Sequence, residues 1–142
     1  MTMAMPKYLP ARYHRPVWHL GEQFDEAMLA AMRPGMRVLD LGSGRGPALW
    51  PKDRPPGTTY AGLDISLKEL QAAPPGSYDE MYQADATQRT PGLEGSFDLV
   101  VSFQVFEHVK PLDVAFDNMR AYLKPGGLAI VQMSATWSVF GM

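Results

Sequence analysis

The stretch Asp40-Leu41-Gly42-Ser43-Gly44-Arg45-Gly46 (residues 40–46) is the part of this sequence that decides the fold. It overlaps the end of a short apolar run at 37–42, which predicts a buried strand that leads into a turn. Alternate glycines allow a tight turn and bring bare backbone against a ligand, where a Cβ would collide. Exposed amides at the start of a following helix would favour an anion such as a carboxylate. The stretch therefore predicts a ligand-binding turn between a strand and a helix.

The spacing of the glycines separates this turn from two other nucleotide-binding turns. A dinucleotide fingerprint needs a glycine three positions after Gly44, but that position is Pro47, and Gly46 comes one residue early. A P-loop needs a lysine followed by serine or threonine at the end of the turn, and the sequence has none there. A pyrophosphate clamp is therefore disfavoured. A glycine-rich turn without any ligand is the alternative that the motif alone leaves open.

Helix and strand patterns alternate along the rest of the chain. Apolar residues at three- and four-residue spacing and a capping box at 66–69 predict the helices, and short apolar runs predict the strands. The expected elements are helices at 21–32, 66–73 and 113–123 and strands at 37–42, 58–65, 81–85, 96–103 and 128–133. This order predicts an α/β fold, a Rossmann-like parallel sheet of about five strands with helices on both faces. We expect a single domain over 1–142, with an N-terminal arm and helix at 1–36 and an α/β core at 37–142.

Two acids end neighbouring predicted strands. Asp64 stands where open α/β folds place an acid that accepts hydrogen bonds from ribose hydroxyls. Its alternative role is to cap the next helix, but Ser66 already fits that role, with Glu69 completing a capping box. Asp85 stands where a carboxylate could accept a hydrogen bond from an adenine amino group; taken alone, it would be an ordinary surface acid. Together with the glycine turn, these acids favour a nucleoside ligand.

With these residues in place, the sequence resembles the class I, S-adenosylmethionine-dependent methyltransferases. Five segments carry the resemblance, in the order and at the spacing that are usual for the family, and one glycine motif would be far less specific. They are VLDLGSGRG (38–46), YAGLDIS (60–66), QADAT (83–87), FDLVVSFQVFEHV (97–109) and LKPGGLAIV (123–131).

The resemblance implies S-adenosylmethionine as the cofactor and assigns its parts to residues of this chain. The glycine turn would line the methionine part, with its leading acid shaping the turn. The acids after the second and third strands would hold the ribose and bound the adenine, and the backbone at 103–104 would flank the sulfonium. The implied positions are Asp40, Gly42, Ser43, Gly44, Gly46, Asp64, Ile65, Asp85, Ala86, Phe103 and Gln104.

Methyl transfer from a sulfonium needs an acceptor held in line more than it needs a catalytic side chain. His108 is the candidate base, because it follows the fourth predicted strand toward the expected cleft. The alternative, which we favour, is that His108 orients the loop after that strand. Tyr13 is the candidate lid in the proline-rich arm, where an aromatic ring near a sulfonium would gain from cation–π attraction. Its alternative role is that of a packing anchor.

Two features depart from the family pattern. Pro47, Pro51 and the run Pro55-Pro56-Gly57 follow the glycine turn, so we expect a helix of only one or two turns there and then a loop. The antiparallel strand pair that usually closes the sheet is also missing after 128–133. The fifth strand should then be an edge with unpaired backbone groups. Either the sequence is a fragment of a longer protein, or this edge is covered by the tail at 135–142, by a second copy or by another subunit.

Composition narrows the classes of function. A chain of 142 residues that is 46% hydrophobic suits one compact domain. A formal charge of -2 without a basic stripe argues against nucleic-acid binding, and the absence of cysteine excludes a disulfide framework, a thiolate nucleophile and a cysteine-ligated metal. We expect no metal site. The first residues lack the apolar core of a signal peptide, and no apolar run reaches membrane-spanning length, so we expect a cytoplasmic protein that does not enter membranes.

Our first hypothesis is an S-adenosylmethionine-dependent methyltransferase that transfers a methyl group to a small-molecule acceptor by direct displacement. The alternative is a shortened, catalytically silent module that keeps the cofactor pocket and serves as a partner or regulatory subunit. A third hypothesis, a nicotinamide-dependent oxidoreductase, rests on the α/β pattern and Asp64 alone, and the glycine spacing argues against it.

Overall fold

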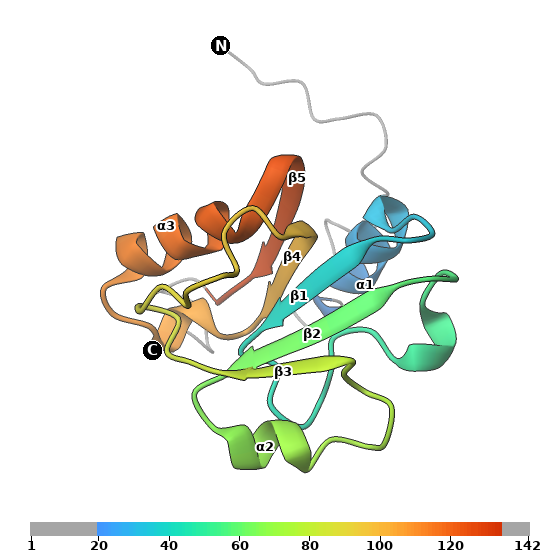
Figure 1. The fold of residues 1–142 in the computed structure, drawn as a ribbon, viewed down its shortest axis with the longest axis horizontal. Coiled ribbons are helices and arrows are strands. Elements are labelled where there is room, and N and C mark those ends of the chain that lie inside the picture. Colours follow the sequence, from blue (N-terminus) through green and yellow to red (C-terminus); the bar gives the residue numbers. More distant parts are fainter. Residues whose placement is uncertain (1–19, 135–142) are drawn as a thin grey trace.

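The fold is a five-stranded sheet in the order β3-β2-β1-β4-β5, seen in a computed structural model that describes residues 20–134 (Figure 1). All four strand pairings within these residues are parallel. The strands are β1 (Arg37–Leu41), β2 (Thr59–Asp64), β3 (Glu80–Gln83), β4 (Phe97–Phe103) and β5 (Leu123–Gln132). The helices are α1 (Leu20–Ala31), α2 (Leu67–Gln71) and α3 (Leu112–Tyr122), with short 3-10 turns η3 (Pro51–Asp53) and η4 (Phe106–His108). The predicted α/β class, strand number and parallel sheet are confirmed.

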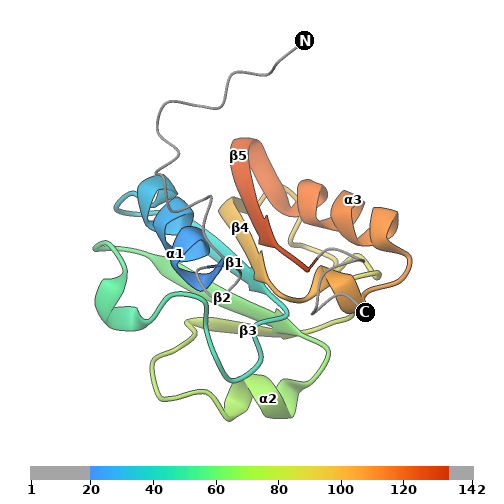
Figure 2. The ribbon, with the colours of Figure 1, turned by 180° about the vertical axis from the view of Figure 1, so that it is seen from behind.

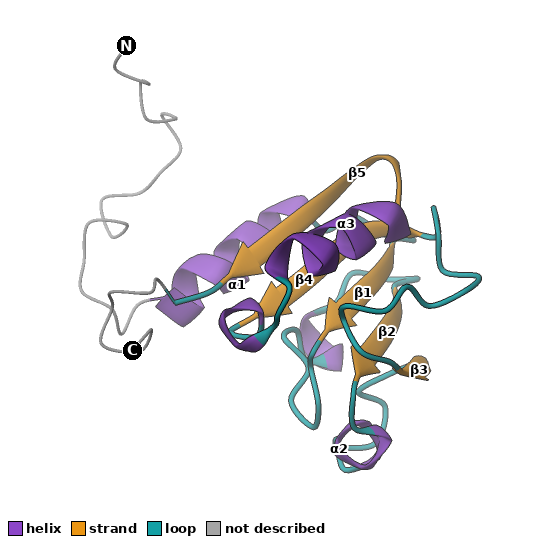
Figure 3. Ribbon diagram, turned by 90° about the vertical axis from the view of Figure 1, so that its left-hand side faces the viewer, coloured by secondary structure: helices purple, strands orange, loops and turns teal. Residues whose placement is uncertain are grey.

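Helices cover both faces of the sheet, as expected. Because successive residues of a strand point to opposite faces, Val38 and Leu39 of β1 belong to different clusters of the core. The cluster around Val38 includes Met28 of α1 and Leu70 of α2, whereas the cluster around Leu39 includes Met119 of α3. Figure 2 shows α1 on the near side of the strands, and Figure 3 shows α3 across the sheet from it.

The prediction of a short helix after the glycine turn is wrong. Residues 46–50 are irregular, and the only helical piece between the glycine turn and β2 is the single 3-10 turn η3, with Pro51 at its start. The side chain of Arg54 holds this loop in place. Its guanidinium donates to the backbone oxygens of Leu49 and Ser77 and stacks over the ring of Tyr60 at 3.7 Å. Proline prevents the helix, and a long-range side-chain clamp takes its place.

The fifth strand begins earlier than predicted. The sequence predicts a strand at 128–133 after a helix that ends at Leu123, but β5 already starts at Leu123. Leu123 pairs with Phe97 and Leu128 pairs with Leu99, so the residues between them bulge out of the register. In the described part of the chain, β5 pairs only with β4 and forms an edge of the sheet, as expected.

Candidate functional site

Two adjoining cavities lie at the carboxyl ends of the parallel strands, where open α/β sheets bind ligands. The first cavity, of about 300 Å³, and the second, of about 270 Å³, share Gly42 in their walls. The predicted site residues at the first cavity are Gly42, Asp64, Ile65, Asp85, Ala86 and His108. Those at the second are Asp40, Gly42, Ser43, Gly46 and Phe103. The structure therefore brings together, around one hollow edge, residues from four of the five sequence segments.

The glycine turn adopts backbone conformations that L side chains rarely take. Gly42 has φ +78° and Gly44 has φ +53°. A Cβ on Gly42 would lie 2.6 Å from both methyl carbons of Val105, which follows β4. The side chain of Val105 therefore leaves no room for a larger residue at position 42, even without a ligand. Gly44 borders neither cavity, and its Cβ position would lie 3.6 Å from Oδ2 of Asp64.

Asp40 is buried and holds the turn from inside. Its Oδ2 accepts hydrogen bonds from the amide of Ala48 at 2.7 Å and from the hydroxyl of Tyr60 at 2.6 Å. Burial raises the pKa of Asp40 to about 6, although both hydrogen bonds and the charge of Arg54 oppose this rise. The expected turn-shaping role of Asp40 thus has a physical basis, since the carboxylate connects the end of β1 to the loop beyond Gly46.

Asp64, the last residue of β2, and the glycine turn are connected through α2. Ser66 caps the helix as predicted, because its Oγ accepts a hydrogen bond from the amide of Glu69. The second half of the predicted capping box is wrong: the amide of Ser66 donates to Oδ1 of Asp64 at 2.9 Å. The carboxylate of Glu69 instead takes two hydrogen bonds from the guanidinium of Arg45. Asp64 therefore takes over part of the capping, and its Oδ2 faces the turn at Gly44.

Asp85 and Ile65 both line the first cavity, one with a charged carboxylate and the other with an apolar side chain. Oδ1 of Asp85 accepts hydrogen bonds from the amide and hydroxyl of Thr87, both at 2.8 Å, and these bonds lower the pKa of Asp85. The carboxylate is thus held ionised and in a fixed orientation. Ile65 exposes 68% of its surface, a large apolar side chain left open beside two acids. An apolar wall with acceptors at its margin is the usual form of a small-molecule site.

The residues at and just after the end of β4 differ in whether they border a cavity. Phe103 is 40% exposed beside the second cavity, and its ring centroid lies 5.1 Å from that of Phe24 in α1. Gln104 has φ +55°, its backbone N–H donates to the backbone oxygen of Gln132, and it borders neither cavity. His108, in η4, borders the first cavity. Tyr13 lies outside the described residues.

Sequence reasoning missed several residues that border the cavities. Val105, Val109 and Lys110 line the first cavity, while Phe24 and Asp25 of α1 line the second. Phe24 is one of the regularly spaced apolar residues of the helix predicted at 21–32. No local pattern indicates that the next residue faces a ligand cavity, because this depends on where α1 packs.

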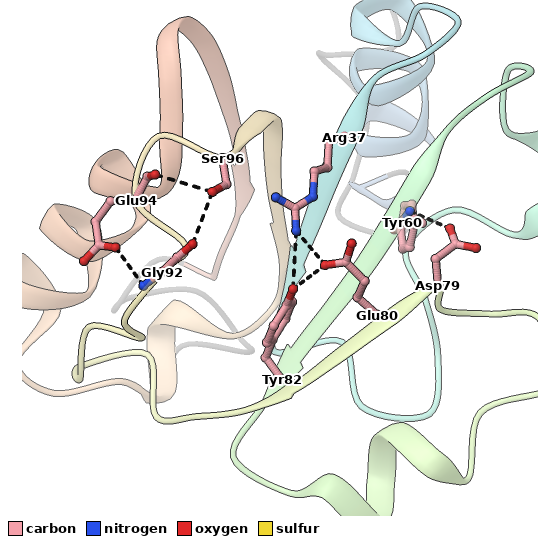
Figure 4. A network of polar contacts seen from close by, with 8 residues as sticks. All are labelled: Arg37, Tyr60, Asp79, Glu80, Tyr82, Gly92, Glu94 and Ser96. Carbon is pink, nitrogen blue, oxygen red and sulfur yellow. Dashed lines mark hydrogen bonds and ion pairs between the residues drawn. The ribbon is translucent and has the colours of Figure 1, made fainter.

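A separate polar network lies away from both cavities, at the amino ends of the strands. The guanidinium of Arg37, the first residue of β1, donates to Glu80 at 2.6 Å and to the hydroxyl of Tyr82 at 3.3 Å (Figure 4). Tyr82 also donates to Glu80. This network connects β1 with β3 on the far side from the glycine turn and is structural. Among the described residues, no group of three His, Asp or Glu side chains is arranged to hold a metal.

A parallel sheet whose first strand ends in a glycine turn, and whose next two strands lead to acids at one hollow edge, is typical of Rossmann-like domains that bind nucleosides. The methyltransferase domain family matches residues 14–139. The chain belongs to this family and is a class I, S-adenosylmethionine-dependent methyltransferase domain. No helix in the described part of the chain is long and apolar enough to cross a membrane.

Named relatives agree with the family. The chain is 34% identical over 119 residues to a ubiquinone biosynthesis O-methyltransferase of Brucella melitensis, an alignment that covers 79% of this chain and 48% of that protein. The chain thus spans about half the length of the curated relatives it matches.

Solved structures of two further proteins resemble the chain. One comes from the complex between the Haloferax volcanii Trm112 methyltransferase activator and its candidate methyltransferase. It has 27% identity and a TM-score of 0.64, over 80% of this chain and 51% of that one. The other is phosphoethanolamine N-methyltransferase 2 of Haemonchus contortus, with 26% identity and a TM-score of 0.64, over 82% of this chain and 28% of that one.

Proposed function

We propose that this chain binds S-adenosylmethionine across the two cavities and transfers its methyl group to a small-molecule acceptor by direct displacement. The observation that carries this proposal is the division of the site at Gly42. Two acids and an exposed apolar side chain border one cavity, and the glycine turn borders the other. That division suits a ligand with a nucleoside at one end and an amino acid at the other.

The residues of the first cavity suit an adenosine. Asp64 would accept hydrogen bonds from the ribose hydroxyls, and Asp85 would accept one from the adenine amino group. Ile65 and Ala86 would pack against the base, which explains why the apolar surface of Ile65 stays open. In the second cavity, Gly42, Ser43 and Gly46 of the turn would face the methionine end.

The bound cofactor would supply a methyl group on a sulfonium, which is already a good leaving group. The residues of the chain would then act mainly by position, which can contribute roughly 7–11 kcal/mol in well-oriented reactions. Phe103 presents an exposed ring at the second cavity, where it would stabilise positive charge. His108 borders the first cavity from a 3-10 turn, a place that suits orientation of the loop at least as well as proton transfer.

Calorimetric titration with S-adenosylhomocysteine tests the proposed binding. We expect affinity in the micromolar range and a rise in melting temperature, because a ligand that binds only the folded state stabilises it. Asp64→Ala should weaken binding strongly. The matched control, Asp113→Ala on the exposed start of α3, should leave it unchanged. If neither heat nor thermal stabilisation appears with the unchanged chain, the proposal is wrong.

The acceptor is proposed to be a small molecule because two of the named relatives are an O-methyltransferase of ubiquinone biosynthesis and a phosphoethanolamine N-methyltransferase. The chain can be supplied with methyl-labelled cofactor and a cell extract, after which the products are separated by size. Label should enter the low-molecular-weight fraction. Label found only in protein or nucleic acid would contradict the small-molecule acceptor.

A second candidate function is a silent cofactor-binding module that works with a partner, either a second copy or another subunit. The observation that favours it is the outer edge of β5, where Leu128 is 52% exposed. An apolar hollow beside this edge is bordered by Phe116, Met119, Arg120, Leu123, Gly127 and Ala129. One solved neighbour comes from a complex with an activator subunit. Turnover by a chain shown by light scattering to be monomeric would eliminate this alternative.

A further inference from the structure

Asp25 of α1 borders the second cavity, although α1 lies outside the strand ends that supply the other acids of the site. Phe24, its neighbour in α1, is 3% exposed and packs its ring against Phe103. Since consecutive helical residues point about 100° apart, packing Phe24 into the core turns Asp25 toward the hollow between α1 and the glycine turn. There Asp25 borders the same cavity as Asp40 and Gly42.

The two carboxylates at this cavity differ in how they are used. Oδ2 of Asp40 already accepts hydrogen bonds from Ala48 and Tyr60, so Asp40 is committed to the turn. Asp25 has no hydrogen bond or ion pair with any residue between 20 and 134. Asp25 is therefore the acid of this cavity that stays available for a ligand.

The surroundings of Asp25 disfavour its negative charge. Partial burial raises the pKa of Asp25, and the nearby charge of Asp53 raises it further. A carboxylate that is partly removed from water, beside a second acid and without a cation from the described chain, gains stability when a cationic ligand group arrives. The second cavity thus offers one carboxylate, that of Asp25, to a cationic group of a ligand.

We propose that the carboxylate of Asp25 accepts a hydrogen bond from the α-ammonium group of the methionine part of S-adenosylmethionine. This proposal rests on the proposed function and adds a binding residue from α1 to it. Gly42 borders both cavities, so a ligand whose adenosine lies at Asp64 extends its amino-acid end past Gly42 into the cavity of Asp25. The helix before β1 then closes the site on the side where the loop at 46–50 is irregular.

Three ligands separate this contact from a merely structural role. S-adenosylhomocysteine carries both the ammonium and the carboxylate, its decarboxylated analogue keeps only the ammonium, and methylthioadenosine carries neither. Asp25→Asn keeps the size of the side chain and removes its charge. We expect this variant to bind the first two ligands about tenfold more weakly or worse, and to bind methylthioadenosine as the unchanged chain does.

Two further variants complete the calorimetric experiment. Asp25→Glu keeps the charge and should retain more affinity for S-adenosylhomocysteine than Asp25→Asn does. Asp113→Asn on α3 makes the same acid-to-amide change away from both cavities and should alter nothing. An equal loss for all three ligands in Asp25→Asn, or no loss for any, would overturn the assignment while leaving cofactor binding intact. If the unchanged chain binds none of the three, the proposed function itself fails and the assignment fails with it.

Discussion

Replacing Gly42 by alanine tests the physical basis of the glycine turn. Gly42 has φ +78°, a conformation that costs an L residue about 1–2 kcal/mol. In addition, the new Cβ would lie 2.6 Å from both methyl carbons of Val105, roughly 1 Å inside the usual carbon–carbon contact distance. Val105 is β-branched, so its side chain cannot simply turn away, and overlap of this kind costs about 1–3 kcal/mol. Gly42→Ala should therefore lower the free energy of unfolding by about 2–5 kcal/mol.

Gly76 provides the matched control. It has φ +82°, close to that of Gly42, but no heavy atom lies within 4 Å of its Cβ position. Gly76→Ala should therefore show the backbone cost alone, about 1–2 kcal/mol. Urea denaturation followed by circular dichroism measures both variants, and the difference between them isolates the overlap with Val105.

A double-mutant cycle with Val105→Ala gives the decisive comparison. Shortening Val105 removes the methyl groups that the new Cβ meets, so the double variant should recover about 1–3 kcal/mol relative to the sum of the single changes. A coupling energy below about 0.5 kcal/mol, or equal losses in Gly42→Ala and Gly76→Ala, would refute the reasoning. The ligand alone would then account for the glycine.

Two other predictions concern the loop after the turn. The folded-state pKa of Asp40, about 6, lies above the ordinary value of 3.8, so the stability linked to its protonated form is complete below about pH 4 and is lost as the pH rises to about 6. Asp40→Asn should remove this loss, roughly 3 kcal/mol at most, so that the urea concentration at the midpoint of unfolding changes less between about pH 4 and 6. A variant with the same pH dependence as the unchanged chain would contradict this prediction. Arg54→Lys keeps the charge but cannot bridge the oxygens of Leu49 and Ser77 with one planar group, so it should lower the melting temperature by several degrees in calorimetry; an unchanged value would contradict the clamp.

Local sequence patterns determined the strands, the glycine turn and the position of two acids of the site. The apolar runs, the glycine turn and the acids at or just after the ends of β2 and β3 are short-range features, because a glycine or an acid after an apolar run marks the end of the strand in the sequence itself. Alternation of strands and helices then left a parallel sheet as the natural arrangement, and parallel strands bring their carboxyl ends to one edge. For this reason Asp64 and Asp85, distant in sequence, were predicted at one site and are found around one cavity.

Only the tertiary structure decided which groups meet. Glu69 bonds Arg45 instead of capping its own helix, and Val105 fills the space that a Cβ on Gly42 would need. Arg54 clamps a loop where proline prevents a helix, and Asp25 faces the second cavity because Phe24 beside it packs into the core. Each of these depends on the distance and orientation between segments far apart in the chain. Propensity and periodicity describe one segment at a time, so they leave such contacts undetermined.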